Sequence, residues 1–491
     1  MDPQRSEQAV SLEPDLDARA RDRVLSGSLA WQVFRFGAPL GFGMGLQTSF
    51  NLVDAYVISR LPTEVAGPAL GALGICDLLT ALGTIISYGL SVATVALITR
   101  RLGEGDERGS RHVAWQSLMV IGALALLFFL LGMFGAETLM TDVVGAKGEV
   151  ARLGTSYVRV GIGGSFTMFL LLHLTALPRA LGSSKMPIAF LLGANVLNFF
   201  LSILMVYGPG DAPDVFSWGP PVARALGVPR LELVGAIWST VISRAVVLLP
   251  LTWLLIRRFG LFKREWRSPL DFKVMRRILS LGWPSSAQLV VRILAMLATQ
   301  SLVNRAFTSA TDVSATTALG IVFRLETMAL FMSLGWGSAA QTFMGVHLGA
   351  GQLGRAQRSG WLAALYNALT MASLAGLYLV AGEAMVRFFD DTPSVVAQAV
   401  TYLRWLAPSY VVFGVGVVLG SAIQGAGATR LSLLIDLCVV ALLQLPLSIL
   451  AVYAYGQTQT ALWQVLVVSN VALAIVYAAA YKRGRFLAKT V

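Results

Sequence analysis

Three polar residues share one face of a largely apolar segment near the start of the chain. Gln47, Asn51 and Asp54 stand at i, i+4 and i+7, so a helix would place them on a single stripe. A carboxylate beside amide groups can bind and release a proton, and the same oxygens can hold sodium, which is a hard cation. The stripe therefore predicts a proton or sodium site around Asp54, and the residue types leave both ions open. The alternative is a structural acid that caps a neighbouring helix.

Further polar residues lie in other apolar segments. Asn198 and Ser202 stand at i and i+4, and Thr240 lies in the next apolar segment along the chain. These three residues are further polar candidates in the apolar segments. The expected substrate surface comprises Gln47, Asn51, Asp54, Asp77 and Tyr157. The sequence leaves open the roles of four more charged residues in apolar segments, which are Arg244, Arg292, Glu326 and Asp436.

The composition shows which elements must position these residues. Of 491 residues, 56% are hydrophobic and 13% are charged, and the mean hydropathy is +0.70. A soluble domain carries about 25% charged residues, so most of this surface must face lipid. Apolar segments long enough to cross about 30 Å of hydrocarbon recur along the chain. We predict twelve membrane-spanning helices, over residues 33–59, 66–98, 112–134, 153–177, 186–208, 233–256, 279–306, 315–346, 359–381, 399–424, 431–454 and 461–481.

Lys and Arg are concentrated in alternate loops between these segments. The loops on the side of the N-terminus hold most of them, and residues 257–277 alone contain eight. Because short cytoplasmic loops are rich in Lys and Arg, both termini are predicted to be cytoplasmic. The net charge of +12 then reflects topology, and we expect no nucleic-acid partner. The predicted parts are a polar tail (1–30), an N-lobe (31–256), a basic linker (257–277), a C-lobe (278–481) and a cytoplasmic C-terminus (482–491).

The chain contains an internal repeat. A shift of 245 residues places Pro39 on Pro284, and a shift of 246 places Gly103 on Gly349, where "RLGEG" matches "HLGAG". Two lobes of six helices would enter the membrane in the same direction and be related by a pseudo-two-fold axis along the membrane normal. Parallel repeats of this kind are typical of alternating-access transporters, whose substrate site lies between the lobes.

The repeat also compares the two lobes at the predicted site. At these shifts Thr299 corresponds to Asp54, and Gln444 corresponds to Asn198. The C-lobe therefore lacks an acid at the equivalent position. We expect ion coupling in the N-lobe, with the C-lobe supplying substrate surface and gating.

No feature of the sequence indicates an enzyme. Cys76 and Cys438 lie far apart in apolar segments, and the three histidines show no metal-ligand spacing. The phosphate-binding motif GxxxxGK[ST] is absent, so ATP is not expected to drive the protein directly. We expect no cofactor other than the coupling ion, H⁺ or Na⁺.

Several motifs resemble the multidrug and toxic compound extrusion (MATE) family of prokaryotes. They are "FNLVDAYVISRLPTEVAGPALGALG", "RRLGEGDERGSR", "HLGAGQLGRAQRSG" and "GSAIQGAGATR", within twelve helices in two lobes. The resemblance covers residues 30–481. It implies that Asp54 is the cation-coupling acid, with Gln47, Asn198 and Thr240 as its partners. The expected cation-coupling site therefore comprises Asp54, Asn198, Thr240 and Ser202.

Two positions depart from the family pattern. Members that couple ions in the N-lobe carry a second aspartate four residues after the helix-five asparagine, where this chain has Ser202. Another subgroup has a glutamate eight residues after the helix-seven proline, and counting from Pro284 reaches Arg292. The first departure leaves one deep acid in the N-lobe, and the second argues against a sodium site at that place in the C-lobe.

The expected function is multidrug efflux across the inner (plasma) membrane. A monomeric antiporter would exchange amphipathic, cationic organic compounds, xenobiotics among them, for protons or sodium ions. The alternative is a flippase for lipid-linked oligosaccharides or other lipids, from the same superfamily, which Arg244 and Arg292 favour. A membrane-embedded enzyme is the least favoured reading.

Overall fold

The computed structural model describes residues 21–22, 24–61, 63–145, 148–262, 268–309, 312–454 and 458–488. Within these ranges the side chains of 49–55, 59, 63–82 and 149 are outside the description. The predicted site residues Asn51, Asp54 and Asp77 therefore lie outside the described side chains.

The described chain is almost entirely helical and contains no strand. The first lobe consists of α3 (Leu29–Ser59), α4 (Thr63–Glu104), α5 (Glu107–Thr138), α6 (Gly148–Gly163), α7 (Phe166–Ala180), α8 (Lys185–Tyr207), α9 (Gly219–Leu226) and α10 (Glu232–Phe259). The second consists of α11 (Phe272–Phe307), α12 (Ser314–Gly349), α13 (Leu353–Arg387), α14 (Pro393–Leu406), α15 (Tyr410–Gly425), α16 (Thr429–Cys438), α17 (Leu445–Tyr453) and α18 (Gln459–Arg483).

The helices have the length and composition of membrane spans. Eleven described segments are long and apolar enough to cross a bilayer, and α3, with 31 residues, adds another long helix. A helix satisfies its own backbone hydrogen bonds, as a hydrocarbon environment requires. Large apolar side chains remain exposed on the outer faces, among them Phe134 and Val380. The predicted fold class, an all-α membrane protein with twelve spanning helices in two six-helix lobes, is confirmed.

The fourth and the tenth predicted spans are broken at equivalent positions. The fourth span divides into α6 and α7 at Gly164 and Ser165, and the tenth divides into α14 and α15 through a 3₁₀ turn at Ala407–Ser409. Gly164 and Ser409 are 245 residues apart (409 − 164), which is the shift of the sequence repeat. The breaks are therefore a shared feature of the two lobes.

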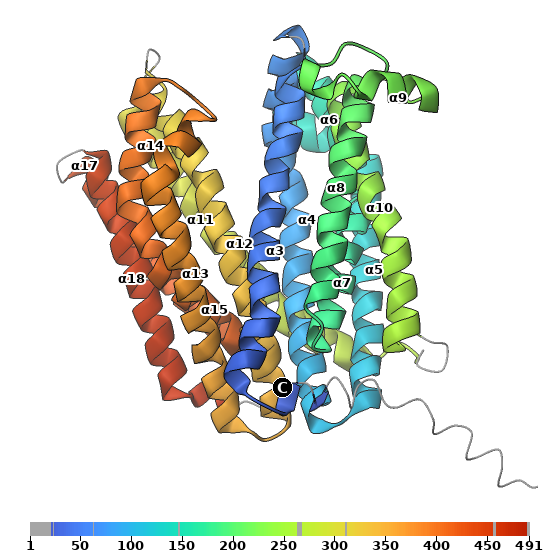
Figure 1. Ribbon diagram of the computed structural model, residues 1–491, viewed down its shortest axis with the longest axis vertical. Helices are drawn as coiled ribbons and strands as arrows, with labels where there is room; N and C mark the ends of the chain where they lie inside the picture. The colour runs from blue at the N-terminus through green and yellow to red at the C-terminus, as the bar shows by residue number, and fades with distance from the viewer. Residues whose placement is uncertain are drawn as a thin grey trace, which may run out of the picture.

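The two lobes converge at one end of the molecule, and their helices diverge toward the other end (Figure 1). At the converging end α4 and α12 meet through glycines. A Cβ atom on Gly103 would lie 2.1 Å from the carbonyl oxygen of Val346, and one on Gly349 would lie 2.0 Å from that of Arg100. Because the repeat pairs Gly103 with Gly349, this contact is symmetric about the pseudo-two-fold axis.

The same symmetry holds deeper in the interface between the lobes. A Cβ atom on Gly89 of α4 would lie 2.6 Å from the carbonyl oxygen of Gly282 of α11. One on Gly335 of α12 would lie 2.3 Å from the carbonyl oxygen of Leu40 of α3. Both contacts are too close for any side chain, so the lobes are joined by backbone-to-backbone packing. Helix α3 begins and α18 ends at this converging end (Figure 1).

Candidate functional site

In the N-lobe the structure brings together two of the predicted partners. Thr240 Oγ1 on α10 donates a hydrogen bond of 3.1 Å to Asn198 Oδ1 on α8, and Ser239 Oγ donates another of the same length. The amide oxygen is thereby held by two hydroxyl groups. Thr240 Oγ1 also lies 3.0 Å from the carbonyl oxygen of Ala236, which keeps its side chain against its own helix.

The other described N-lobe candidates occupy distinct positions. Ser202 lies one helical turn beyond Asn198, and its hydroxyl is buried without a hydrogen-bond partner among the described groups. Tyr157 on α6 is buried, at 6% exposure, in the apolar cluster at the diverging end. Gln47 on α3 is half-buried. The predicted stripe of Gln47, Asn51 and Asp54 falls within α3, with the last two side chains outside the description.

Helix α3 is fixed to α8 next to the predicted acid. Tyr207 Oη donates a 2.7 Å hydrogen bond to the carbonyl oxygen of Val57, three residues after Asp54. Tyr56 and Tyr207 both pack against the ring of Phe216 in the loop after α8. This end of α3 is therefore held in place by aromatic packing.

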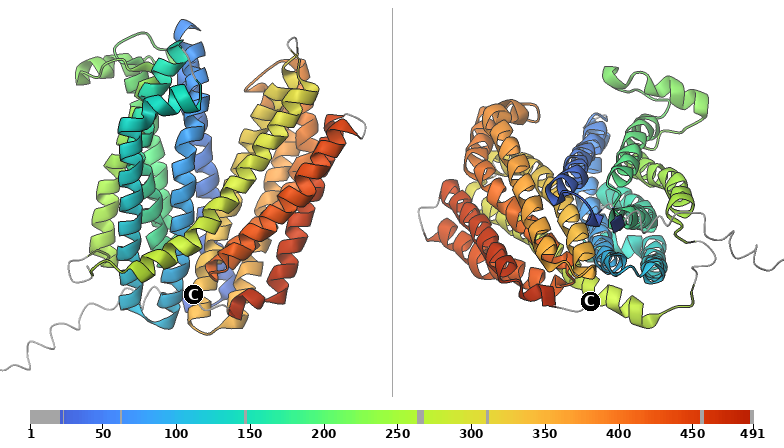
Figure 2. Two further views of the ribbon diagram at one scale, coloured as in Figure 1. Left: turned by 180° about the vertical axis from the view of Figure 1, so that it is seen from behind. Right: turned by 60° about the horizontal axis from the view of Figure 1, so that its bottom comes forward.

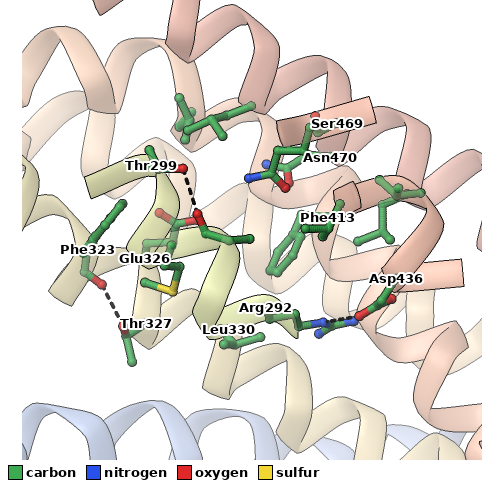
Figure 3. Close-up of a pocket in the computed structure, with 18 residues that line it drawn as sticks. Arg292, Thr299, Phe323, Glu326, Thr327, Leu330, Phe413, Asp436, Ser469 and Asn470 are labelled. Atoms are coloured by element: carbon green, nitrogen blue, oxygen red, sulfur yellow. Dashed lines mark hydrogen bonds and ion pairs between the residues drawn. The ribbon is translucent and has the colours of Figure 1, made fainter. Parts of the chain in front are cut away.

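The C-lobe contains a cavity of about 90 Å³, which Figure 3 shows in close-up. Its charged residues are Arg292 on α11, Glu326 on α12 and Asp436 on α16. Phe413 and Leu330 form part of its apolar wall. The cavity thus combines an apolar lining with two acids and one base, as organic-ligand sites do.

Arg292 and Asp436 form an ion pair across this cavity. Arg292 Nε lies 2.6 Å from Asp436 Oδ2, and the two side chains are 13% and 1% exposed. Tyr477 Oη on α18 donates to Asp436 Oδ1 at 2.6 Å, and Gln288 Nε2 donates to Tyr477 Oη at 2.9 Å. The guanidinium also lies over the ring of Phe413, 5.9 Å from its centre. Asp436 is therefore balanced by a positive charge and a hydroxyl group.

Glu326 has a different environment. Tyr402 Oη on α14 donates a 2.6 Å hydrogen bond to Glu326 Oε2. None of the ion pairs described for the chain includes Glu326, so this carboxylate adds one negative charge to the cavity when it is ionised. The cavity lining as a whole then has a net charge of −1, from one base against two acids.

The sequence repeat pairs residues that line this cavity with residues of the predicted N-lobe site. Thr299, the equivalent of Asp54, and Gln444, the equivalent of Asn198, both line it. Arg292 also lines it and lies 245 positions after Gln47 (292 − 47). Gln444 ends a π-helical turn, Val439–Gln444, which interrupts the eleventh span beside Asp436. π-helical turns often occur at functional sites.

Sequence reasoning had identified the charges of this cavity but not their arrangement. The sequence leaves the roles of Arg292, Glu326 and Asp436 open. The signal that could have found the cavity is the repeat, applied to all three residues of the stripe rather than to Asp54 alone. The described residues contain no group of three or more His, Cys, Asp or Glu that could hold a metal ion.

Comparison with a family model identifies the family of the chain. The MatE model matches residues 39–204 and 289–450, one stretch in each half of the chain. The chain belongs to the MatE family. The two matches agree with the duplication, and the resemblance to MATE transporters noted in the sequence is confirmed. Because members of this family are transporters, this MATE protein is a multi-pass membrane transporter and not an enzyme.

Individual relatives cover nearly the whole chain. The probable multidrug resistance protein YpnP of Bacillus subtilis is 27% identical over 441 residues, 88% of this chain and 90% of the relative. The FAD transporter of Shewanella oneidensis is 25% identical over 440 residues, 89% of this chain and 91% of the relative. A crystal structure of a MATE protein in complex with MaL6 has a TM-score of 0.83 at 21% identity, covering 96% of this chain and 99% of that one. This last similarity shows the shared fold.

Proposed function

We propose that this MATE protein is a secondary antiporter of the inner membrane, with both termini in the cytoplasm. It exchanges amphipathic organic cations for protons or sodium ions by alternating access between its lobes. Asp54, with Asn198, Thr240 and Ser202, is the ion-coupling site in the N-lobe. The C-lobe cavity contributes to substrate binding.

One observation carries this proposal most directly, which is the symmetry between the C-lobe cavity and the predicted site. Thr299 and Gln444 line the C-lobe cavity. Their equivalents under the repeat, Asp54 and Asn198, are therefore expected to line a corresponding cavity in the N-lobe. Asn198 Oδ1 accepts hydrogen bonds from two hydroxyl groups, which sets the orientation of the amide, and its Nδ2 group can donate to an acid; this supports Asn198 as a partner of Asp54. An acid inside a membrane protein is costly unless it has such a role.

The charges support a cationic substrate over the flippase alternative. Of the two arginines that favour a lipid flippase, Arg244 and Arg292, the second has its charge balanced by Asp436. The carboxylate of Glu326 is left to attract a cation, and Phe323 and Phe413 line the same cavity. Aromatic faces also attract organic cations. Because one of the relatives is an FAD transporter, flavin adenine dinucleotide is the anionic compound with which to compare transport of the cation.

The arrangement of the lobes supports alternating access. The lobes are joined by glycine contacts at the end that holds the start of α3 and the end of α18, and they diverge at the other end. With cytoplasmic termini this is the outward-open state. The inward-open state requires the glycine contacts to separate.

Transport by everted membrane vesicles tests the proposal. A fluorescent amphipathic organic cation should accumulate when a proton or sodium gradient is imposed and should leak back when the gradient is collapsed. Flavin dinucleotide serves as the anionic comparison. Accumulation that needs ATP and ignores the gradient would disprove the antiport mechanism, and faster transport of the flavin would disprove the substrate class.

Two variants separate coupling from substrate binding. Asp54→Asn keeps the shape and hydrogen bonds of the side chain but cannot carry a proton, so gradient-driven efflux should fall to the background level. Glu326→Gln removes the negative charge of the C-lobe cavity, so the half-saturating concentration of the cation should rise about tenfold with coupling retained. Release of protons or sodium ions from proteoliposomes measures the coupling in each case.

A further inference from the structure

A pocket of about 480 Å³ lies at the converging end of the molecule, where α4, α5 and α11 meet. Four basic residues and one acid line it: Arg100, Arg101, Glu104, Lys273 and Arg277. The first turns of α11 run beside the ends of α4 and α5, as Figure 2 shows from behind and from below. The pocket is thus built from both lobes, with α4 and α5 on one side and α11 on the other.

The pocket has an excess of positive charge. Arg100 Nε lies 3.4 Å from Glu104 Oε1, and Arg101 Nη1 lies 2.8 Å from Asp106 Oδ2, outside the pocket. The Glu104 side chain is 47% exposed and that of Asp106 is 43% exposed, and with both carboxylates counted the four cations of the pocket are still in excess by two charges. Four cations beside two exposed carboxylates therefore make a site for an anion with more than one negative oxygen, such as a phosphate group.

The pocket also has an apolar part. Leu97, Val113 and Val274 line it beside the basic residues. At the start of α11, Leu270 and Phe272 expose 55% and 74% of their surface. Apolar side chains next to Lys and Arg are typical of a helix end at the membrane interface. A ligand that combines a phosphate with acyl chains fits this combination better than free phosphate does.

Hydrogen bonds hold the α11 side of the pocket in place. Trp115 Nε1 donates to the carbonyl oxygen of Ser268 at 3.0 Å, and Gln116 Nε2 donates to that of Pro269 at 2.8 Å. The backbone N–H of Asp271 donates to Gln116 Oε1 at 3.1 Å. Residues 268–271 are therefore fixed to α5, and the basic residues of α11 face those of α4 at a set position.

We propose that this pocket binds the phosphate headgroup of an anionic phospholipid from the cytoplasmic leaflet. The bound lipid joins Arg100 and Arg101 of the N-lobe to Lys273 and Arg277 of the C-lobe and reduces the repulsion between them. It thereby stabilises the state in which the lobes are joined at this end. The assignment to the cytoplasmic leaflet rests on the orientation in the proposed function. Basic pockets between helices on that side are suited to anionic lipids.

Lipid-dependent thermal stability of the purified, detergent-solubilised protein tests the binding. Phosphatidylglycerol should raise the melting temperature in a saturable way, and phosphatidylcholine should not, because it has no net charge. Inorganic phosphate is the third addition. An equal effect of inorganic phosphate would overturn the lipid assignment in favour of a free anion, and an equal effect of phosphatidylcholine would overturn the charge argument.

A pair of matched variants locates the site. Lys273→Gln with Arg277→Gln removes two charges from the pocket and should raise the half-saturating concentration of phosphatidylglycerol about tenfold or more. Arg257→Gln with Arg258→Gln removes two exposed charges from the end of α10 and should leave it unchanged. Equal responses of the two double variants would overturn the site. If the first double variant does not fold, Lys273→Gln alone, with native mass spectrometry of bound lipid, makes the same comparison.

Hydrogen exchange tests the effect on the lobes. Phosphatidylglycerol should slow exchange in the last turn of α4 and the first turn of α11 in the parent protein but not in the Lys273→Gln, Arg277→Gln variant. Unchanged exchange in the parent, with lipid bound, would overturn the stabilisation of the joined state. These measurements need no transport, so a failure of the antiport proposal and a failure of the lipid site give different results.

Discussion

At the residue scale, the ion pair between Arg292 and Asp436 holds two largely buried charges inside the C-lobe. It joins α11 to α16 over a separation of 144 residues in sequence. Each charge is tolerated in the interior because the other is 2.6 Å away and because Tyr477 completes the hydrogen bonding of Asp436. The pair therefore keeps the C-lobe cavity polar without giving it a net charge.

Breaking this pair should destabilise the protein more than replacing it. Arg292→Met leaves the Asp436 carboxylate buried without a cation and should reduce the free energy of unfolding by about 3–5 kcal/mol. The double change of Arg292→Met and Asp436→Leu removes both charges and should recover most of that loss. Thermal unfolding in detergent measures both variants. A double variant as unstable as the single one would show that the pair is not the source of the stability.

Ser202 offers a test of the N-lobe site at the same scale. Its hydroxyl is buried and has no hydrogen-bond partner among the described groups. If Ser202 faces Asp54, as the proposed site requires, Ser202→Asp adds a second acid beside it, and two neighbouring carboxylates retain a shared proton to higher pH. The pH optimum of efflux should move upward, while Ser202→Asn, the uncharged control, should leave it in place. An unchanged profile in an active Ser202→Asp protein would separate Ser202 from Asp54.

At the scale of elements, the close crossing of α4 and α12 holds the lobes together. Gly103→Val would force side-chain atoms into the carbonyl of Val346, at a cost of about 1–3 kcal/mol, and should favour the separated state. Labelling of cysteines placed at this end should become faster. Gly122→Val is the matched control, because a Cβ atom there meets nothing within 4 Å. Equal labelling of both variants would exclude the crossing as a determinant of the conformation.

The start of α11 provides a pH-dependent element outside the membrane. Asp271 caps this helix through the N–H groups of Val274 and Lys273, and His112 Nε2 lies 3.2 Å from its carboxylate. The Val274 N–H and His112, followed by the Lys273 N–H, lower the pKa of Asp271 below its ordinary value of 3.8, and burial opposes them. The charge of Asp271 therefore stabilises the folded protein at pH values above 3.8, the ordinary pKa. This stabilisation is lost as the pH falls through the lower pKa of the folded state.

Asp271→Asn tests this contribution. Asparagine can still cap the helix but carries no charge, so the melting temperature of the variant should lie below that of the parent at neutral pH. The difference between the two melting temperatures should become smaller below about pH 4, because the carboxylate of the folded parent becomes protonated. A gap that stays constant from pH 7 to pH 3 would show that the charge of Asp271 does not contribute.

At the scale of the whole molecule, transport requires the two lobes to move against each other. Ser286 Oγ on α11 donates a 3.3 Å hydrogen bond to the carbonyl oxygen of Ile86 on α4, so the lobes touch here in the joined state. In a protein with Cys76 and Cys438 replaced by alanine, Ile86→Cys with Ser286→Cys should form a disulfide on oxidation and stop efflux. Reduction should restore it. The two single-cysteine variants are the controls, and full transport by the oxidised pair would contradict alternating access by lobe separation.

The sequence by itself determined the spans and the two lobes. Whether a segment spans the membrane depends on the summed hydropathy of its own residues, so the apolar runs located the spanning helices. The repeat revealed the symmetry that Gly103 and Gly349 show in the interface between the lobes. The proximity of Asn198 and Thr240 also agreed with the resemblance to the family. These features follow from local composition and from comparison of the chain with itself.

The tertiary structure alone decided which charges meet. The sequence showed Arg292, Glu326 and Asp436 in apolar segments, but the partner of each depends on the rotation and tilt of its helix. The same holds for the basic pocket, where α11 of one lobe crosses to the ends of α4 and α5 of the other. Contacts of this kind are set by packing among helices that are far apart in the chain, and the hydropathy pattern within any one helix does not contain them.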